Sequence, residues 1–418
     1  MRDRLRRSAR LAPLVALAGV VGPGLVAANA GNDAGGIATY ASVGARYGYD
    51  LLWMMVLITV SLVVVQEMAA RMGAVTGKGL AELIREQYGP RWSLFSTVAV
   101  LVANLGICIS EFVGIGAAFG LAHVPVQLSV PVAAVVVWLL LVRGTYAVAQ
   151  RVFVAMTIPF FAYPVAAVLA HPHWAAVGHA IVAPHIRLTS PYLLLFVATA
   201  GTTITPFMQL YLQSAVVERG LGPEDIPAER VEVASASIFA NLVASFIIIA
   251  TGATLFVHGD RTVSSAADAA RALEPFAGRF AEALFAVGLL GASMLAAAIL
   301  PVTAAYVIAE TFGLEKGIAR RPREAPVFVG VITVLVALGA VVAIIPHLPV
   351  IKLLVSVQIV NGALLPITLF FVWRLARDRE LMGDYRNSRG FDVLAAATVV
   401  ATSALSLLLL GVTLTGNA

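Results

Sequence analysis

The chain has 418 residues, of which 60% are hydrophobic and only 12% are charged. A water-soluble domain of this length needs much more charged surface, so the composition excludes a soluble fold and indicates that a lipid bilayer is the solvent. The single cysteine, Cys108, excludes an intrachain disulfide and a thiolate metal cluster.

Long, continuous apolar stretches rich in Leu, Ala and Val run through the whole sequence. A spanning helix needs roughly 20 mostly apolar residues, and the weak alternation of a membrane β-barrel is missing. We therefore predict an all-α polytopic membrane protein with about eleven spanning helices. The predicted stretches are 11–46, 50–72, 93–121, 126–142, 148–170, 189–217, 234–257, 279–311, 326–346, 348–374 and 391–414.

The basic residues agree with this number of spans, because short cytoplasmic loops collect Lys and Arg. With the amino terminus inside, most basic residues fall on the inner side, at 2–10, 71–91, 143–151, 219–230, 316–323 and 374–389. We predict a multi-pass protein of the cell inner membrane with a cytoplasmic N-terminus and an extracytoplasmic C-terminus. The net charge of +5 then follows from topology, and no nucleic-acid partner is expected.

The amino-terminal segment allows a second interpretation. Its basic residues, its apolar run and Ala28-Asn29-Ala30 together resemble a secretory signal peptide. Cleavage there would leave only a short helix before Tyr47, and Gly22-Pro23-Gly24 is unusual in the apolar core of a signal. We therefore favour a membrane helix.

The first and sixth stretches are interrupted by glycine, proline and polar residues, from Asn32 to Gly36 and from Gly201 to Pro206. Such breaks free backbone groups that lipid cannot satisfy, so they must face protein or water. Two interrupted helices, one opening each set of five, are typical of an inverted-repeat transporter with its site near the bilayer midplane. We predict one transporter domain over 1–418 with a LeuT-like 5+5 inverted repeat. The repeats would cover about 11–170 and about 189–374, and an eleventh, peripheral helix would cover about 391–414.

Asp33 lies in the first break, beside backbone carbonyls that are freed there. An uncompensated carboxylate in the middle of a membrane costs several kcal/mol, so an intramembrane Asp is a functional candidate. Carbonyl and carboxylate oxygens together form a site for a hard cation. The alternative is that Asp33 caps the half-helix that follows it through a backbone N–H, and both roles are compatible.

Amide side chains on two other helices are further candidates. Gln358 and Asn361 lie three residues apart on the tenth stretch and so share one helix face. Gln209 and Gln213 follow the second break and lie four residues apart. These four could complete an ion site, or they could form hydrogen bonds between helices, which is common for buried amides in membranes.

Several short motifs occur together. They are Gly22-Pro23-Gly24, Asp33-Ala34-Gly35-Gly36, Tyr47-Gly48-Tyr49 with Leu51-Leu52-Trp53, Thr76-Gly77-Lys78 with Leu80-Ala81-Glu82-Leu83-Ile84-Arg85, Leu210-Tyr211-Leu212-Gln213-Ser214-Ala215, and Leu381-Met382-Gly383. In this combination the chain resembles the natural resistance-associated macrophage protein (NRAMP) family, over most of its length. The resemblance implies a transporter of divalent metal ions and not an enzyme. The metal is then the transported substrate, no cofactor is implied, and no obligate protein partner is evident.

The departures from the family pattern fall on its metal site. The family's first break reads Asp-Pro-Gly-Asn, and this chain keeps the Asp as Asp33 but has Gly36 in place of the Asn ligand. The second break of the family reads Met-Pro-His, and here it reads Thr205-Pro206-Phe207. Loss of the soft thioether removes selection for manganese and iron, and a roomier oxygen-lined site suits magnesium, which keeps several waters. The chain is therefore similar to the NRAMP-related magnesium transporter branch, which implies Mg²⁺ transport with Mn²⁺ also accepted.

The resemblance also implies individual roles. Asp33 would be a ligand, Gly36 would leave room for water, and Gln358 would match a glutamine of helix ten. Thr203 or Thr205 would supply oxygens from the second break, and Gln209 has no certain family position because this break has one more residue than usual.

Proton coupling can be assessed in the same way. The family carries acidic residues on helix three ahead of a stretch that resembles Glu111-Phe112-Val113-Gly114, and the matching positions here are Leu101 and Cys108. The second-break histidine is also missing. We predict uptake by alternating access without proton coupling, and Glu67 and Glu111 are the remaining candidates for a coupled proton, unless they pair with inward-facing polar groups.

Other functions are less compatible with the sequence. A proton-coupled Mn²⁺/Fe²⁺ carrier with other ligands remains an alternative, as does an amino-acid carrier on the same fold, although Asp33 would repel a substrate carboxylate. The sequence shows no Gly-rich phosphate loop, zinc-type His spacing or nucleophile elbow for an intramembrane enzyme, and no filter repeat for a channel.

All seven histidines fall at the predicted outer ends of the helices. They could attract metal ions to the outer face, or they could be amphipathic rings that lie at the membrane interface.

Overall fold

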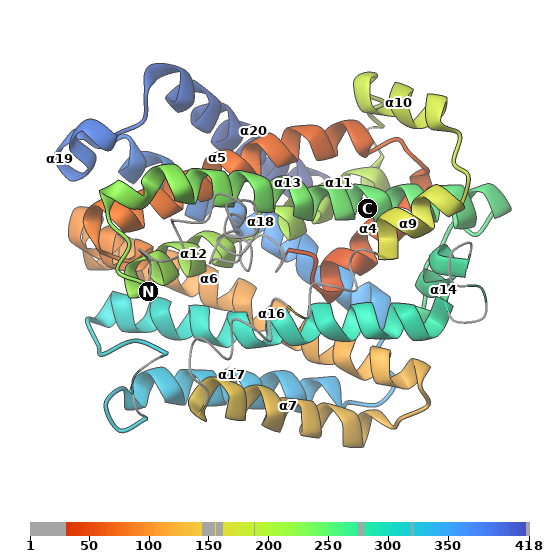
Figure 1. The fold of residues 1–418 in the computed structure, drawn as a ribbon, viewed down its shortest axis with the longest axis horizontal. Helices are drawn as coiled ribbons and strands as arrows, with labels where there is room; N and C mark the ends of the chain where they lie inside the picture. The colour runs from red at the N-terminus through yellow and green to blue at the C-terminus, as the bar shows by residue number, and fades with distance from the viewer. Residues whose placement is uncertain are drawn as a thin grey trace, which may run out of the picture.

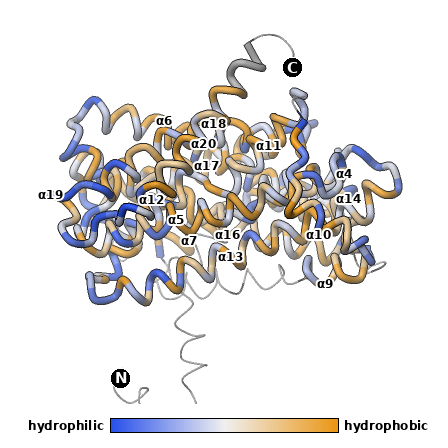
Figure 2. The backbone as a smooth tube through the Cα atoms, turned by 90° about the horizontal axis from the view of Figure 1, so that it is seen from above, coloured by the Kyte–Doolittle hydropathy of each residue, from blue (hydrophilic) through white to orange (hydrophobic). Residues whose placement is uncertain are grey.

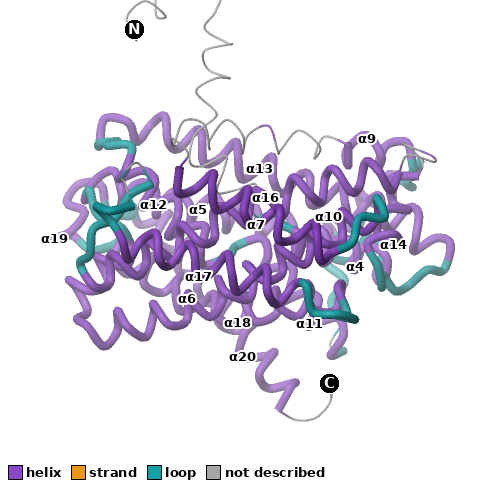
Figure 3. Tube along the Cα trace, turned by 90° about the horizontal axis from the view of Figure 1, so that it is seen from below, coloured by secondary structure: helices purple, strands orange, loops and turns teal. Residues whose placement is uncertain are grey.

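The computed structural model describes residues 31–143, 155, 162–187, 189–274, 278, 281–318, 320 and 322–414, and within the last range it describes no side chain after 408. Figure 3 shows only helices and loops in this part of the chain. The all-α prediction is therefore confirmed.

The fold is built from longer helices, several of which run along the length of the molecule (Figure 1). They are α4 (Ala34–Tyr47), α5 (Leu52–Thr76), α6 (Leu80–Leu121), α7 (Val126–Arg143), α11 (Ser190–Thr203), α12 (Pro206–Glu218), α13 (Ile226–Thr251, continued by a π-helical turn, Gly252–Phe256), α16 (Ala281–Phe312), α17 (Pro326–Ala343), α18 (Val350–Ala376) and α20 (Arg389–Leu414). Shorter helices lie at the ends, namely α9 (Ala162–Leu169), α10 (Trp174–Val182), α14 (Ala266–Ala270) and α19 (Arg379–Met382), with single 3₁₀ turns at Pro223–Asp225, Arg271–Leu273 and Gly383–Tyr385.

Nine helical spans in the described part are long and apolar enough to cross a membrane, if α11 and α12 are taken as one interrupted span. They match nine of the eleven predicted stretches. The other two, 11–46 and 148–170, are described only from residue 31 and at residues 155 and 162–170. The motif Gly22-Pro23-Gly24, the signal-peptide alternative and the first half of the first span lie outside the described residues.

The two ends of the molecule are polar and its middle is apolar. Hydrophilic residues gather around α19 at one end and on the connections near α14 at the other, whereas the helices between them are largely hydrophobic (Figure 2). We call these the α19 end and the α14 end. Since the apolar zone lies between them, the long helices cross it from end to end.

Some helix boundaries differ from the predictions. The third predicted span begins at 93, but α6 begins at Leu80, because a helical segment joins it through a kink at Gly89 (φ 81°) and Pro90. Gly89 adopts a left-handed conformation that other residues rarely tolerate, and Pro90 can open the next helical segment without losing a needed N–H. The short helix α10 was not predicted, and it bends by 118° from α9.

The breaks are shorter than expected. The first was predicted to include Gly36, but α4 is helical from Ala34 onward because Asp33 caps it. The second was predicted from Gly201, but α11 continues through Thr203, and only residues 204 and 205 separate it from α12. Fewer backbone N–H and C=O groups are therefore left without a helical hydrogen bond than the glycines and threonines of the two breaks suggested.

Candidate functional site

Asp33 forms the start of α4. Its backbone is extended (φ −68°, ψ 178°), and its Oδ1 accepts a hydrogen bond of 2.5 Å from the backbone N–H of Gly36. The side chain is completely buried. The capping role is thus confirmed, and it leaves oxygen lone pairs on the carboxylate for other partners.

The amides of α18 reach both breaks. Gln358 Nε2 donates to Oδ1 and Oδ2 of Asp33, at 3.2 Å each. Asn361 Nδ2 donates to the Gly201 carbonyl at 2.6 Å and to Gln358 Oε1 at 3.3 Å. Both amides are buried, and Asn361 Oδ1 has no hydrogen-bond partner in the described part of the chain. The predicted pair therefore links Asp33 in the first break to the backbone beside the second.

Two glycines let the first break pack closely against Gln358 and Thr202. A Cβ atom on Gly35 would overlap Gln358 Nε2, so a larger residue would push the amide away from Asp33. A Cβ atom on Gly36 would lie 2.5 Å from the Gly31 carbonyl oxygen and 2.9 Å from Thr202 Oγ1. The room expected beside Gly36 is thus filled in this conformation, and it is filled by oxygens.

Thr202 is the second-break residue that contacts the first break, and it was not among the predicted ligands. Its hydroxyl donates to the Gly31 carbonyl at 3.4 Å. The predicted Thr203 instead donates to the Thr199 carbonyl at 2.7 Å and lies 2.9 Å from the Tyr40 hydroxyl. The signal that separates Thr202 from its neighbour is helical phase, which requires knowing that α11 is still helical at this position.

Thr205 and Gln209 lie at the start of α12. Thr205 is buried, and its hydroxyl has no partner among the described residues. The amide of Gln209, in its better-satisfied orientation, donates to the carbonyls of Thr205 and Pro206. Gln213 lies further away and donates to the Lys78 carbonyl at 2.9 Å, so it joins α12 to the start of α6 and not to the breaks.

Glu111 adds a second carboxylate at the start of α4. Its Oε2 accepts a hydrogen bond of 3.1 Å from the Ala34 N–H, and its Oε1 accepts one of 3.1 Å from the Ser110 hydroxyl. Glu111, like Asp33, is completely buried, and no basic side chain in the described residues forms an ion pair with either acid. Two carboxylates thus meet at one helix N-terminus, whose partial positive charge favours them but does not neutralise them.

Close helix packing holds these groups together. A Cβ atom on Gly114 of α6 would overlap Ala34 Cβ and lie 2.5 Å from Ser293 Oγ of α16. Small residues at such crossings let helix backbones approach closely in membranes. Because Gly114 follows Glu111 by one helical turn, this contact seats the Glu111 carboxylate against α4.

Glu67, the other candidate for a coupled proton, is paired. It accepts hydrogen bonds from Arg71 at 2.9 to 3.1 Å and from Arg230 at 2.7 Å. Arg71 is buried and also donates to Asn387 Oδ1 at 2.7 Å and to the Tyr385 carbonyl. This cluster ties α5 to α13 and to the connection between α18 and α20, so its role is structural.

Replacing Arg71 with alanine is expected to destabilise the protein by about 3 kcal/mol, because it removes the bidentate partner of a buried carboxylate. The measurement is the midpoint of thermal unfolding in detergent. Arg386→Ala, at an exposed position on the same connection, is the control and should leave the midpoint unchanged. Equal midpoints for all three proteins would refute the structural role.

The histidines gather at the α14 end. His171, His173, His179 and His185 line one pocket of about 920 Å³. His173 accepts a hydrogen bond from Ala176 N–H and so caps α10. No group of three or more His, Cys, Asp or Glu side chains in the described part of the chain has metal-binding geometry.

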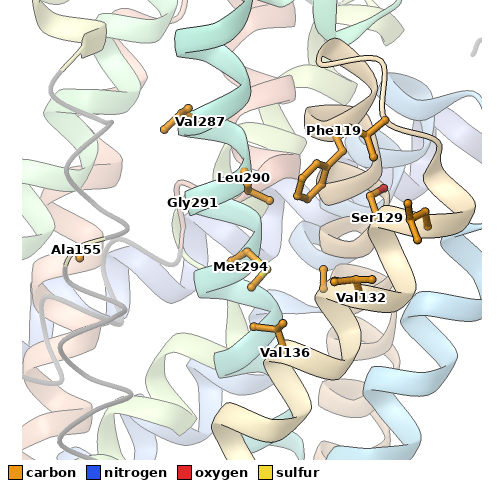
Figure 4. Close-up of a pocket in the computed structure, with 12 residues that line it drawn as sticks. Phe119, Ser129, Val132, Val136, Ala155, Val287, Leu290, Gly291 and Met294 are labelled. Atoms are coloured by element: carbon orange, nitrogen blue, oxygen red, sulfur yellow. The ribbon is translucent and has the colours of Figure 1, made fainter.

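A further pocket, of about 750 Å³, lies beside α7 and α16 (Figure 4). Phe119, Val132, Leu290 and Met294 are among its lining residues, and Ser129 is the one polar side chain among the described residues that line it. An ion needs several oxygen ligands, so this apolar surface does not form an ion path. The candidate site is therefore the region around Asp33.

Comparison with known proteins agrees with this geometry. The family model described as natural resistance-associated macrophage protein-like matches residues 24–411. The chain belongs to this family. It is 31% identical over 397 residues to a protein of Ralstonia nicotianae named divalent metal cation transporter MntH, with 88% of this chain and 85% of that protein covered.

Solved structures show that the fold is that of this NRAMP family. The manganese transporter of Eremococcus coleocola, solved with an aromatic bis-isothiourea compound, superposes with a TM-score of 0.75 at 21% identity, over 96% of this chain and 87% of that one. MhsT in complex with L-phenylalanine superposes with a TM-score of 0.63 at 12% identity, over 96% and 98%. The predicted LeuT-like architecture is thus confirmed, and the departures at Gly36 and Thr205 occur within a true NRAMP fold.

Proposed function

We propose that this NRAMP protein transports divalent metal ions across the cell inner membrane by alternating access, with Mg²⁺ as its main substrate and Mn²⁺ also accepted. Transport is not coupled to protons. The membrane potential drives it, which contributes about 2.3 kcal/mol per charge per 100 mV. Beyond the metal ion and the bilayer, transport requires no other partner.

The observation that carries this proposal is the meeting of two buried carboxylates, Asp33 and Glu111, at the first turn of α4 without a basic partner among the described residues. Buried charge of one sign requires compensation. A divalent cation supplies it, and carboxylate, amide and carbonyl oxygens are the ligands that hard cations prefer. Asp33, Gln358, Asn361 and oxygens of the second break would hold the ion.

The preference for Mg²⁺ rests on the absence of a soft ligand. Thr205 takes the place of the family methionine, and Met208, three residues later, has its sulfur 3.7 Å from the Gln66 amide. With oxygen ligands only, nothing in the site favours a softer ion. Gly36 also favours Mg²⁺: because it has no side chain, the ion can keep a bound water at this position once the site opens.

The absence of proton coupling is argued from helix three. The positions that match the family's acids are Leu101 and Cys108, and Cys108 is buried with its thiol donating to the Leu335 carbonyl at 3.5 Å. Neither side chain can take up and release a proton near neutral pH as a carboxylate in a proton relay does. In the proposed orientation the α19 end lies in the cytoplasm, because the described basic residues concentrate there. The two proposed repeats are the two sets of five helices predicted from the sequence.

A proton-coupled manganese carrier is the second candidate. Glu111 lies directly beside Asp33 through Ala34 N–H, and a buried carboxylate there could take up a proton when the metal leaves. The name of the relative, divalent metal cation transporter, agrees with a divalent metal substrate for this candidate as well.

Uptake into proteoliposomes separates the two candidates. Initial rates are measured for Mg²⁺, Mn²⁺ and Ca²⁺ at a fixed membrane potential with a pH dye inside. The proposal expects Mg²⁺ and Mn²⁺ influx without internal acidification. Acidification that tracks metal influx would replace it by the coupled mechanism, and exclusion of Mg²⁺ would refute the proposed selectivity.

Thr205→Met is expected to shift the ratio of Mn²⁺ to Mg²⁺ transport about tenfold toward Mn²⁺, because it returns a thioether to the site. Competition of the two ions for uptake measures the ratio. Thr205→Leu is the matched control, since it has a similar size and no sulfur. The same shift in both variants would show that volume, and not ligand softness, sets the preference.

A further inference from the structure

A pocket of about 600 Å³ opens at the α14 end between α4, α11, α18 and the loop before α14. The same three helices carry Asp33, Thr202 and Gln358. Ser42, which lines the pocket from α4, lies nine residues after Asp33, about 13 Å along the helix. We call this pocket the vestibule, because in the proposed orientation it lies on the extracytoplasmic side of the site.

The charge of the vestibule is opposite to what a cation path requires. Arg46, Arg261 and Lys352 line it, and none of its lining residues in the described part of the chain is acidic. All three are exposed. The guanidinium of Arg261 lies 3.5 Å from the ring centre of Phe256, and that of Arg46 lies 5.8 Å from the ring centre of Tyr47. These cation–π contacts hold the two guanidinium groups without neutralising them.

Two other basic side chains described at this end are neutralised. Arg187 pairs with Asp50 at 2.5 Å, and Arg271 pairs with Asp260 at 3.2 Å. By contrast, none of the three vestibule residues forms an ion pair with an acid in the described part of the chain.

The acids on either side of the vestibule loop are already engaged. Asp260, which directly precedes Arg261, pairs with Arg271 at 3.2 Å. Asp268 accepts hydrogen bonds from Ser264 and Ser265 and lies 3.9 Å from Arg271. It is therefore the third residue of a capping box with Ser265 at the start of α14, and it forms no ion pair with Arg261. Among the described residues, the basic side chains of this end that lack an ion pair therefore line one pocket.

We propose that the vestibule binds a divalent oxyanion, such as sulfate or a phosphate group, and that this anion accelerates the passage of metal cations to Asp33. Three guanidinium and ammonium groups around one pocket are a suitable donor set for an oxyanion, and the hydroxyls of Ser42 and Ser356 line the same pocket. An empty vestibule repels a divalent cation, whereas an occupied one has most of its charge cancelled. The effect on cation passage rests on the proposed transport function, but anion binding does not.

Binding is tested with the full-length protein in nanodiscs of phosphatidylcholine, which carry no net charge. Radiolabelled sulfate is the probe, at constant ionic strength. We expect saturable binding by the parent and at least about tenfold weaker binding by the triple variant Arg46→Gln, Arg261→Gln, Lys352→Gln. Arg187→Gln, which removes one charge from the same end outside the vestibule, is the matched control and should bind as the parent does.

The effect on transport is tested by Mn²⁺ influx into phosphatidylcholine vesicles in external chloride or sulfate of equal ionic strength. Sulfate should raise the initial rate about tenfold for the parent and leave the triple variant, which is already fast in chloride, unchanged. A second set of vesicles contains phosphatidylglycerol. If this lipid accelerates the parent but not the triple variant, and sulfate does not bind, the occupant is a lipid headgroup.

The proposal is overturned if neither sulfate nor phosphatidylglycerol distinguishes the parent from the triple variant. Because sulfate binding is measured without transport, its failure leaves the metal-transport proposal intact. Conversely, a chain that binds sulfate in the vestibule but carries no metal would refute only the proposed function. Thermal unfolding of the triple variant, expected to match the parent because its three side chains are exposed, shows that it is folded.

Discussion

Replacing Asp33 with asparagine is expected to lower metal uptake by about 100-fold or more while leaving the protein folded. Asparagine has nearly the same shape and its oxygen can still accept from Gly36 N–H, so the cap of α4 is retained. The negative charge is lost, and with it a ligand whose charge compensates a desolvated metal. Initial Mg²⁺ and Mn²⁺ influx into proteoliposomes measures the effect.

Asp384→Asn is the control for this variant, since Asp384 is an exposed acid at the α19 end. It should transport at the parent rate. Thermal unfolding of both variants near the parent midpoint would exclude a folding defect. Uptake by Asp33→Asn at the parent rate would show that the ion does not bind at the first break.

Replacing Gly201 with alanine is expected to destabilise the protein by about 2 kcal/mol or more and to impair transport together with stability. A Cβ atom there would overlap the Gln358 carbonyl oxygen and the Gly362 nitrogen, and it would lie 2.6 Å from Gly362 Cα. These are backbone atoms that cannot rotate away, so α11 and α18 must separate. Separation would break the bond from Asn361 to the Gly201 carbonyl and move Gln358 relative to Asp33.

Thermal unfolding in detergent and metal influx are measured on the same preparations. Gly330→Ala in α17 is the matched control, because a Cβ atom there meets nothing within 4 Å. The control should keep or slightly raise the midpoint, since alanine favours the helix. An unchanged midpoint for Gly201→Ala would mean that the α11–α18 crossing is not tightly packed.

Local sequence predicted the spans well because a membrane helix satisfies its own backbone and needs only a long apolar run. α17 and α18 lie within a few residues of the predicted stretches. The predicted helix boundaries were wrong where a more polar helical segment outside the apolar zone continues into a span. Residues 80–88 ahead of the third span and 226–233 ahead of the seventh are helical without a side-chain cap; buried residues such as Leu83 and Ile226 pack there, and hydropathy does not report such packing.

The site was predicted in part for a related reason. Asp33 stands out because a carboxylate in an apolar span is rare, and Gln358 and Asn361 stand out because helical spacing places them on one face. Thr203 was predicted in place of Thr202. Consecutive side chains of an α-helix point in directions 100° apart, so only one of these two neighbours can face the first break. α11 stays helical through Thr203, and the sequence alone does not show how close to Pro206 the helix continues.

By itself, the sequence determined that this is an all-helical membrane transporter of the NRAMP family, that two of its helices are broken, and that an acid lies at the first break. These properties follow from composition and local pattern. Only the tertiary structure decided that Glu111 joins Asp33 at the start of α4, that Thr202 faces the first break, and that Arg46, Arg261 and Lys352 line one vestibule. Such meetings depend on how closely helices approach at glycines far apart in the chain, and no local pattern encodes those distances.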